Sequence, residues 1–410
     1  MGCSNTKVKD EIPDKENKEN IQNNNENKNK EIKEDKDKKE EPKKIEIKGN
    51  VITMIIKIAK STLDKVDFLN NDIYFLDNMN LKEGKVKHFH DNLNELNESN
   101  VELFIDYIQY PFQKYFRFKK EGEYTVVLRF KDPIKNCSRM FYDCKCLIKI
   151  DLSSFDIKNV TNMDEMFYGC SNLRSIDLSS IDTKKVIDMK SMFSGCIKLG
   201  KLDLSTLDTS YVTDMSYMFN GCENLTNLDL SSFNTIHVNN MAHMFEYCTK
   251  LINIDISSLN TQNVTDMSFM FYSCLSLLNI DLSAFNTQDV TNMSSMFENC
   301  NALTSLDLSS FITNKVIDMN SMFNGCFSLT NINLSSFDTG NVTDMKSMFY
   351  DCKRLTNLDL SNFDMKKVSN TNNMFKYCSN LKDMKLNEKN KSIIEKTLKK
   401  DNIEVEIEVI

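Results

Sequence analysis

The sequence lacks the features that mark most membrane-spanning proteins and enzymes. It contains no run of about 20 apolar residues, so no segment is expected to cross a bilayer. It contains no glycine-rich phosphate loop, no Gly-x-Ser-x-Gly turn and no cysteine–histidine nucleophile motif. The four histidines, His88, His90, His237 and His243, form no metal-ligand spacing. We therefore expect a chain that is not an enzyme, with no cofactor, no metal site and no small-molecule substrate.

The cysteines also lack the close Cys-x-x-Cys pairs of metal sites and redox motifs, and Cys144-x-Cys146 is the one near pair. Instead, ten cysteines are spaced 26 residues apart along the chain: Cys144, Cys170, Cys196, Cys222, Cys248, Cys274, Cys300, Cys326, Cys352 and Cys378. One cysteine per repeat predicts a single column of buried thiols, which suits a reducing compartment. Disulfides and a metal site are the disfavoured alternatives.

This period predicts a solenoid, because one structural unit is repeated and each unit contacts only its neighbours. The repeat from Leu225 to Lys250 opens with Leu225, Leu228 and Leu230, a pattern typical of the short strand of leucine-rich repeats. Leu228 and Leu230 alternate with polar residues, so one strand face is apolar. Stacked repeats are therefore expected to form a parallel sheet.

The second half of the repeat predicts a short helix. Met241, Met244, Phe245 and Cys248 follow helical spacing, and Asn240 precedes them as a capping residue. Glycines in several repeats, such as Gly169, suit a helix stop. The predicted fold class is an α/β solenoid, with one short strand and one short helix per 26-residue repeat, preceded by a small β-rich domain.

The repeat resembles the BspA-like family of leucine-rich-repeat proteins, with its mycoplasma-type repeat. The resemblance is carried by Leu-Asp-Leu-Ser-Ser-Phe-Asn-Thr at 228–235 and by Val-Thr-Asp-Met-Ser-x-Met-Phe-x-x-Cys at 212–222 and 264–274. It covers about residues 137–386. It implies a curved, non-enzymatic solenoid used for adhesion or for binding a partner.

Composition divides the chain into four parts. Residues 1–50 are rich in Lys, Glu and Asn and are expected to form a disordered tether. Residues 51–136 show strand patterns without a repeat and predict a β-rich capping domain, with a separate binding module as the alternative. Residues 137–386 form about nine full repeats and a partial one. Residues 387–410 predict a helix and an edge strand that cap the far end.

The chain begins Met1-Gly2-Cys3-Ser4-Asn5-Thr6, which fits the N-myristoylation signal. Gly2 offers an unhindered amine for the acyl chain, and Cys3 beside it is a palmitoylation candidate. Two acyl chains anchor a protein stably, whereas one holds it only marginally. No hydrophobic signal segment is visible at this end. We therefore expect a lipid anchor at Gly2 and Cys3 on the cytoplasmic face of a membrane.

The polar face of the predicted strands carries a column of acids on the expected concave side. Its members are Asp151, Asp177, Asp203, Asp229, Asp255, Asp281, Asp307 and Asp359. Three interpretations stay open: a solvated ladder bonded to neighbouring serines, a docking strip for a basic protein, or a row of calcium ions. One carboxylate per repeat makes a poor oxygen cage for calcium.

The charge of the repeats is acidic. Residues 137–386 hold 20 Lys and Arg against 27 Asp and Glu, within a total net charge of −8. Such a surface repels nucleic acid and anionic lipid. Two functions follow as hypotheses: a membrane-tethered scaffold that binds a basic protein partner through the acidic surface, or a cell-surface or secreted adhesin. An enzyme hidden in residues 51–136 is disfavoured because that region has no convergent polar motif.

Overall fold

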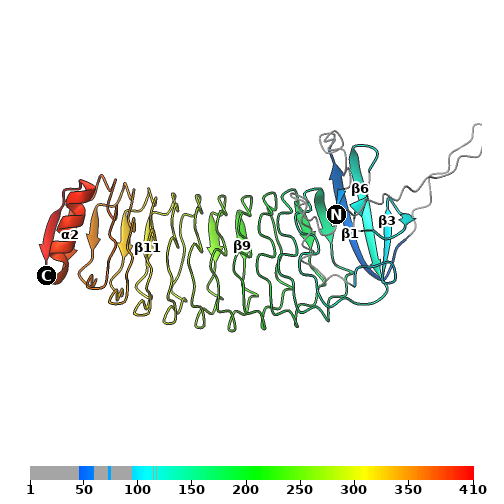
Figure 1. Cartoon of the computed structure of the whole chain (residues 1–410), viewed down its shortest axis with the longest axis horizontal. Helices are drawn as coiled ribbons and strands as arrows, with labels where there is room; N and C mark the ends of the chain where they lie inside the picture. Colours follow the sequence, from blue (N-terminus) through cyan, green and yellow to red (C-terminus); the bar gives the residue numbers. More distant parts are fainter. Residues whose placement is uncertain (1–45, 60–72, 75–94, 114, 117) are drawn as a thin grey trace, which may run out of the picture. The chain divides into compact units, whose positions relative to one another are not determined.

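The computed structural model of the chain describes residues 46–59, 73–74, 95–113, 115–116 and 118–410. The chain divides into two units, residues 1–44 and 45–410. Only the second contains described residues, so the anchor and most of the tether predicted for residues 1–50 lie outside them. Within the second unit, the coils follow one another in sequence order along one axis, from the sheet that contains β1 to the terminal helix α2 (Figure 1).

The N-terminal strands form a sheet that runs directly into the first coils. β2 (Ile73–Tyr74) and β5 (Tyr115–Phe116) pair with each other in a separate two-stranded sheet. The strands of the main sheet are β1 (Asn50–Ile58), β3 (Val101–Ile105), β4 (Ile108–Tyr110) and β6 (Gly122–Phe130). The two coil strands that join them are β7 (Leu147–Asp151) and β8 (Ser175–Asp177), in the order β4-β3-β6-β1-β7-β8. Because β1 pairs antiparallel with both β6 and β7, it covers the edge that the first coil would otherwise expose.

The later coils contribute short parallel strands. These are β9 (Asn227–Asp229), β10 (Asn253–Asp255), β11 (Ser305–Asp307), β12 (Asn331–Asn333), β13 (Asn357–Asp359) and β14 (Asp383–Leu386). They form separate groups, β9 with β10, β11 with β12, and β13 with β14, so the parallel ladder is interrupted. Hydrogen bonds between the strands therefore cannot by themselves account for the regular stacking.

The helix predicted in each repeat is absent from the described coils, and this is a correction to the sequence interpretation. The segment holding the two methionines, the phenylalanine and the cysteine consists of successive tight turns. Each such segment contains two left-handed residues, for example Glu165 with φ 54° and Gly169 with φ 70°. A right-handed helix cannot pass through two left-handed residues four positions apart. The solenoid itself is confirmed, with low helix content.

The backbone bonding of this segment explains why turns replace the helix. Alternate N–H groups donate to the next coil, as from Glu165 to the Lys190 carbonyl (2.9 Å) and from Phe167 to the Met192 carbonyl (2.9 Å). The N–H groups between them close turns within the coil, as from Met166 to Met163 (3.2 Å). A helix would use all of these donors internally and leave neighbouring coils unlinked. Parallel bridges between the residues equivalent to Asn240 continue this ladder from Asn136 to Asn370 without a gap.

The interior consists of columns of identical side chains. Successive phenylalanines from Phe141 to Phe375 are buried and stack with ring centroids 5.3–6.0 Å apart. The ten repeat cysteines are buried and free, as predicted. Burial raises the pKa of the Cys248 thiol to about 12, so the thiol keeps its proton and donates to the Phe219 carbonyl (3.2 Å). This bond recurs along the column and satisfies a carbonyl of the preceding coil.

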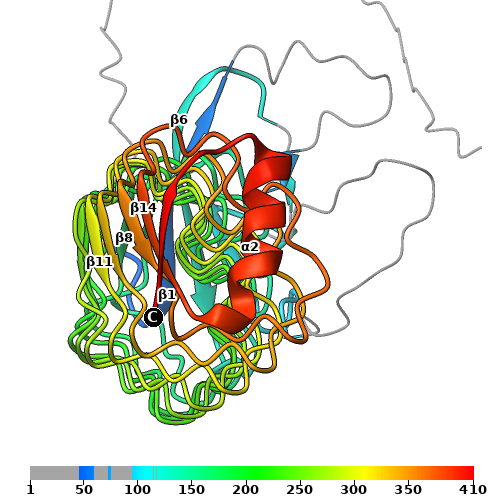
Figure 2. The same ribbon diagram turned by 90° about the vertical axis from the view of Figure 1, so that its left-hand side faces the viewer.

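The C-terminal end of the stack is covered by α2 (Glu388–Asp401) and by β15 (Glu406–Val409), which pairs parallel with β14. Ile394 and Leu398 of α2 are buried in the common core, and Asp401 accepts a hydrogen bond from the Phe375 N–H (2.9 Å). Viewed along the stack, α2 and the strand column lie on opposite sides (Figure 2). No helix in the described ranges has both the length and the apolar character needed to cross a bilayer.

Candidate functional site

The eight aspartates predicted as a docking strip are brought together by the stacking. We call Asp151, Asp177, Asp203, Asp229, Asp255, Asp281, Asp307 and Asp359 the acid strip. Seven of these side chains are exposed and Asp151 is half-buried. Paired strands place Asp229 beside Asp255 and Asp151 beside Asp177, and such neighbours are about 4.8 Å apart across a sheet. The acid strip is therefore unbroken from Asp151 to Asp307, and neutral Asn333 separates Asp307 from Asp359.

Each aspartate of the acid strip also has a local structural role, because it ends the strand in a turn. Its Oδ1 accepts a hydrogen bond from the N–H of the serine two residues later, as from Ser231 to Asp229 (2.9 Å) and from Ser257 to Asp255 (3.0 Å). Hydrogen bonds from the following serine hold the pKa of Asp177, Asp203, Asp229, Asp255, Asp281 and Asp307 below its ordinary value. These six carboxylates are therefore ionised at neutral pH, and part of each carboxylate already serves the turn.

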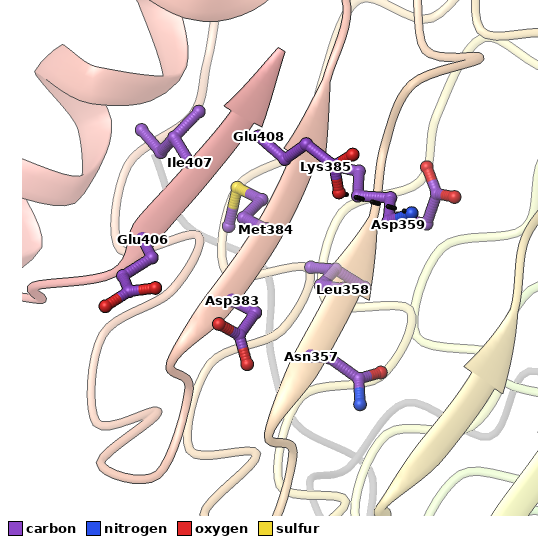
Figure 3. A pocket seen from close by; sticks show the side chains of 9 residues that line it. All are labelled: Asn357, Leu358, Asp359, Asp383, Met384, Lys385, Glu406, Ile407 and Glu408. Atoms are coloured by element: carbon purple, nitrogen blue, oxygen red, sulfur yellow. Dashed lines mark ion pairs between the residues drawn. The ribbon is translucent and has the colours of Figure 1, made fainter. Parts of the chain in front are cut away.

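The acid strip ends at Asp359, because the equivalent residue of the next coil is Lys385. Lys385 lies beside Asp359 on the neighbouring strand. Lys385 pairs with Glu408 of β15 (3.3 Å). Figure 3 shows this end of the strip, a shallow groove over β13, β14 and β15 whose other charged lining residues are Asp359, Asp383 and Glu406. One lysine among four acids leaves the groove acidic.

The middle of the solenoid is the most acidic part. Between Ser205 and Ser305 the sequence holds ten acids and one base, Lys250. The Lys250 ammonium donates to Asn224 on the preceding coil and does not pair with a carboxylate of the acid strip. A basic protein surface would therefore meet little repulsion along these coils.

The other predicted site residues, Gly2 and Cys3, lie outside the described residues. Within the described ranges, no group of three or more His, Cys, Asp and Glu side chains is placed to hold a metal ion.

Sequence reasoning missed a group of rings on the turn segments. Tyr217, His243 and Phe269 come from three successive coils and stack face to face, with centroids 4.2 and 4.6 Å apart. Tyr272 lies 5.5 Å from Phe269, and Tyr247 lies 5.2 Å from Tyr272. We call these five residues the central aromatic cluster. An alignment of the repeats would have pointed to this cluster. The residues equivalent to Tyr217 in three later coils are the serines Ser295, Ser321 and Ser347, so the rings stand out.

A carboxylate lies beside the central aromatic cluster. Glu246 accepts hydrogen bonds at Oε2 from His243 Nδ1 (2.7 Å) and from Asn220 Nδ2 (2.6 Å). These bonds hold the carboxylate in place, although its side chain stays 13% exposed. The sequence indicates no role for His243 beyond the absence of a metal-ligand spacing, and the structure gives it a definite position between two rings.

Comparisons with known proteins found one matching family model and remote similarity to solved structures. The family model of "Mycoplasma protein of unknown function, DUF285" matches residues 135–251, 198–306, 223–329 and 302–399. Among solved structures, a leucine-rich repeat protein from Bacteroides ovatus is 17% identical with a TM-score of 0.34, covering 72% of this chain and 90% of its own. A leucine-rich repeat protein from Eubacterium ventriosum is 15% identical with a TM-score of 0.29, and the match covers 58% of this chain and 78% of that protein. No curated protein sequence matches the chain.

The family matches together run from residue 135 to residue 399, which is more than half of the chain. They coincide with the stacked coils and their C-terminal cap, and they agree with the mycoplasma-type repeat expected from the sequence. The chain therefore belongs to the DUF285 family of repeat proteins, which is described as a Mycoplasma family of unknown function.

Proposed function

We propose that this protein is a non-enzymatic scaffold that binds a basic protein partner along its solenoid and is held on the cytoplasmic face of a membrane. The observation that carries the binding half is the acid strip, which is unbroken and exposed from Asp177 to Asp307 and nearly free of basic neighbours in its middle. A solenoid presents such a surface over many repeats, which suits an extended partner. Complementary charge speeds the encounter and selects the partner.

The membrane half of the proposal is supported by Gly2 and Cys3 at the start of the sequence. The acidic solenoid is repelled by anionic lipid, so the acyl chains would supply the attraction to the bilayer. Two chains would give stable attachment, and the polar segment after them would let the solenoid reach its partner.

Lipid attachment is tested by metabolic labelling with an alkynyl myristate in cells that express the full chain. We expect the wild-type protein to be labelled and found with membranes, whereas Gly2→Ala is unlabelled and largely soluble because the acyl acceptor is lost. Cys3→Ser should keep the label and lose most of the stable attachment. An unlabelled wild-type protein, or one digested by protease on intact cells, would instead favour the cell-surface adhesin.

Partner binding is tested with a short labelled peptide of Gly-Ser-Arg repeats, measured by fluorescence anisotropy. The triple variant Asp203→Asn, Asp229→Asn, Asp255→Asn is expected to bind it about tenfold more weakly, with a reduced salt dependence. Asparagine keeps the turn, since Asn333 occupies this position and accepts from the Ser335 N–H (3.1 Å). Asn333→Asp is the opposite control and should bind slightly more tightly.

The same peptide should bind equally well at pH 7 and pH 5. The pKa values of the central aspartates are lowered by hydrogen bonds from the following serines, so these groups remain charged until the pH falls below their ordinary value. Unchanged affinity in the triple variant would contradict a role for the acid strip in binding.

A further inference from the structure

The central aromatic cluster occupies backbone positions that disfavour large side chains. Tyr217, His243 and Phe269 have φ values of 60°, 61° and 57°, in the left-handed region. The equivalent residue is also left-handed in every other described coil, but there it is Arg139, Glu165, Ser191, Ser295, Ser321, Ser347 or Asn373. A bulky residue with positive φ is a genuine outlier, and such residues gather at functional sites. Three in succession therefore call for an explanation beyond coil stacking.

The chain itself shows what rings and a carboxylate of these turn segments bind elsewhere, with the repeat positions exchanged. Arg139 and Glu165 hold the position of His243, whereas Tyr142 and Tyr168 hold that of Glu246. In the first coils, Tyr142 and Tyr168 stack with centroids 4.8 Å apart. The Arg139 guanidinium lies 5.7 Å from the centroid of the Tyr142 ring and forms an ion pair with Glu165. Two rings, a guanidinium and a carboxylate thus form one unit, in which the positive charge contacts both the ring face and the carboxylate.

The last coils repeat this arrangement with a lysine. Tyr350 and Tyr377 pack edge to face with centroids 5.2 Å apart. The Lys376 ammonium lies 5.3 Å from the centroid of the Tyr377 ring. At both ends of the solenoid, therefore, the chain places one of its own cations over the rings of these turn segments.

The central aromatic cluster has the rings and the carboxylate without such a cation. Within the described part of the chain, no Lys or Arg head group lies over these rings. Lys250, the one base of these coils, donates to Asn224. Both hydrogen bonds to Glu246 end on Oε2, and none within the described residues ends on Oε1. Tyr247 is 44% exposed, so the edge of the cluster is open to a ligand.

We propose that the central aromatic cluster, together with Glu246, binds an arginine side chain of a basic protein partner. The guanidinium stacks on the rings at the open edge of the cluster, where Tyr247 is exposed, and pairs with Glu246, as Arg139 does with Tyr142 and Glu165. This inference rests on the proposed function, because it assumes a protein partner on the solenoid. It deepens that function by naming a binding position on the turn segments, distinct in residues from the acid strip.

The test compares the Gly-Ser-Arg peptide with the same peptide carrying citrulline, which keeps the shape of arginine and removes its charge. Wild-type protein is expected to prefer the arginine peptide. The double variant Tyr217→Ser, Phe269→Ser is expected to bind it about tenfold more weakly, because two ring contacts are lost. Serine is the matched choice, since Ser295, Ser321 and Ser347 adopt the same backbone conformation. The control Ser321→Ala should bind like wild type.

The outcomes separate this inference from the proposed function. Weaker binding in the double variant, with an unchanged melting temperature, supports the inference. If the double variant binds like wild type while the triple acid-strip variant is weakened, the inference is overturned and the scaffold proposal stands. If wild-type protein binds neither peptide, both are overturned. Binding of cellohexaose, a neutral oligosaccharide that stacks on rings, without binding of either peptide would also overturn the inference.

Discussion

Met244→Asp is expected to unfold several coils at once and to lower the free energy of unfolding by more than about 4 kcal/mol. Met244 is fully buried and lies in a column between the equivalent methionines Met218 and Met270. A carboxylate there has no polar partner, and the coil that it disrupts supports both neighbours. In a solenoid the loss of one coil also removes its two interfaces, so the damage spreads.

The measurement is thermal unfolding followed by circular dichroism, with Met244→Leu as the control. Leucine has a similar volume and should cost less than about 1.5 kcal/mol. A melting temperature for Met244→Asp close to that of Met244→Leu would contradict the stacking register. The expected pattern for Met244→Asp is a broad transition, because coils far from Met244 can remain folded after its neighbours unfold.

Removal of residues 387–410 is expected to lower the melting temperature by about 10 °C or more and to promote association of the chain with itself. The segment buries Ile394 and Leu398 against the last coils, and its β15 covers the edge of β14. It also supplies Asp401, which accepts a hydrogen bond from the Phe375 N–H. This N–H has no carbonyl of a following coil to which it could donate. Without it, the last coil exposes apolar side chains and an open strand edge.

This prediction is checked by thermal unfolding together with light scattering over a range of protein concentrations. Lys396→Ala changes an exposed residue of the same helix and should leave both properties unchanged. Asp401→Asn tests the bond to Phe375 alone, and its effect should be much smaller than that of the deletion. A truncated chain that stays monomeric and melts like the full one would show that α2 and β15 do not act as a cap.

The N-terminal sheet has the corresponding role at the other end, and it shows how burial is completed by elements far apart in the sequence. β1 inserts between β6 and β7, so residues near position 50 join strands that begin after residue 120. The strand patterns in residues 51–136 predicted these elements as strands. Their order could not be predicted, because alternating apolar residues specify a buried face and not a neighbour.

The prediction of a helix in each repeat was wrong for a definite reason. Met241, Met244, Phe245 and Cys248 lie on one face both of a helix and of the observed run of turns, so their spacing alone does not distinguish the two. The deciding feature is the pair of left-handed residues in each segment, and most of these are not glycine. His243 and Tyr247 occupy both positions of one coil, with φ values of 61° and 57°. Bonding to the next coil stabilises them there.

The 26-residue period by itself determined the solenoid, the buried cysteine column and the alignment of Asp229 with its equivalents, because identical units that stack must bring identical side chains together. Only the tertiary structure decided that turns replace helices, that the parallel pairing of the β-strands is interrupted, and that no lysine or arginine of the described residues lies over the rings around His243. These features depend on which backbone groups and which rings of neighbouring coils meet. Such contacts are set by the spacing between coils, which no single repeat encodes.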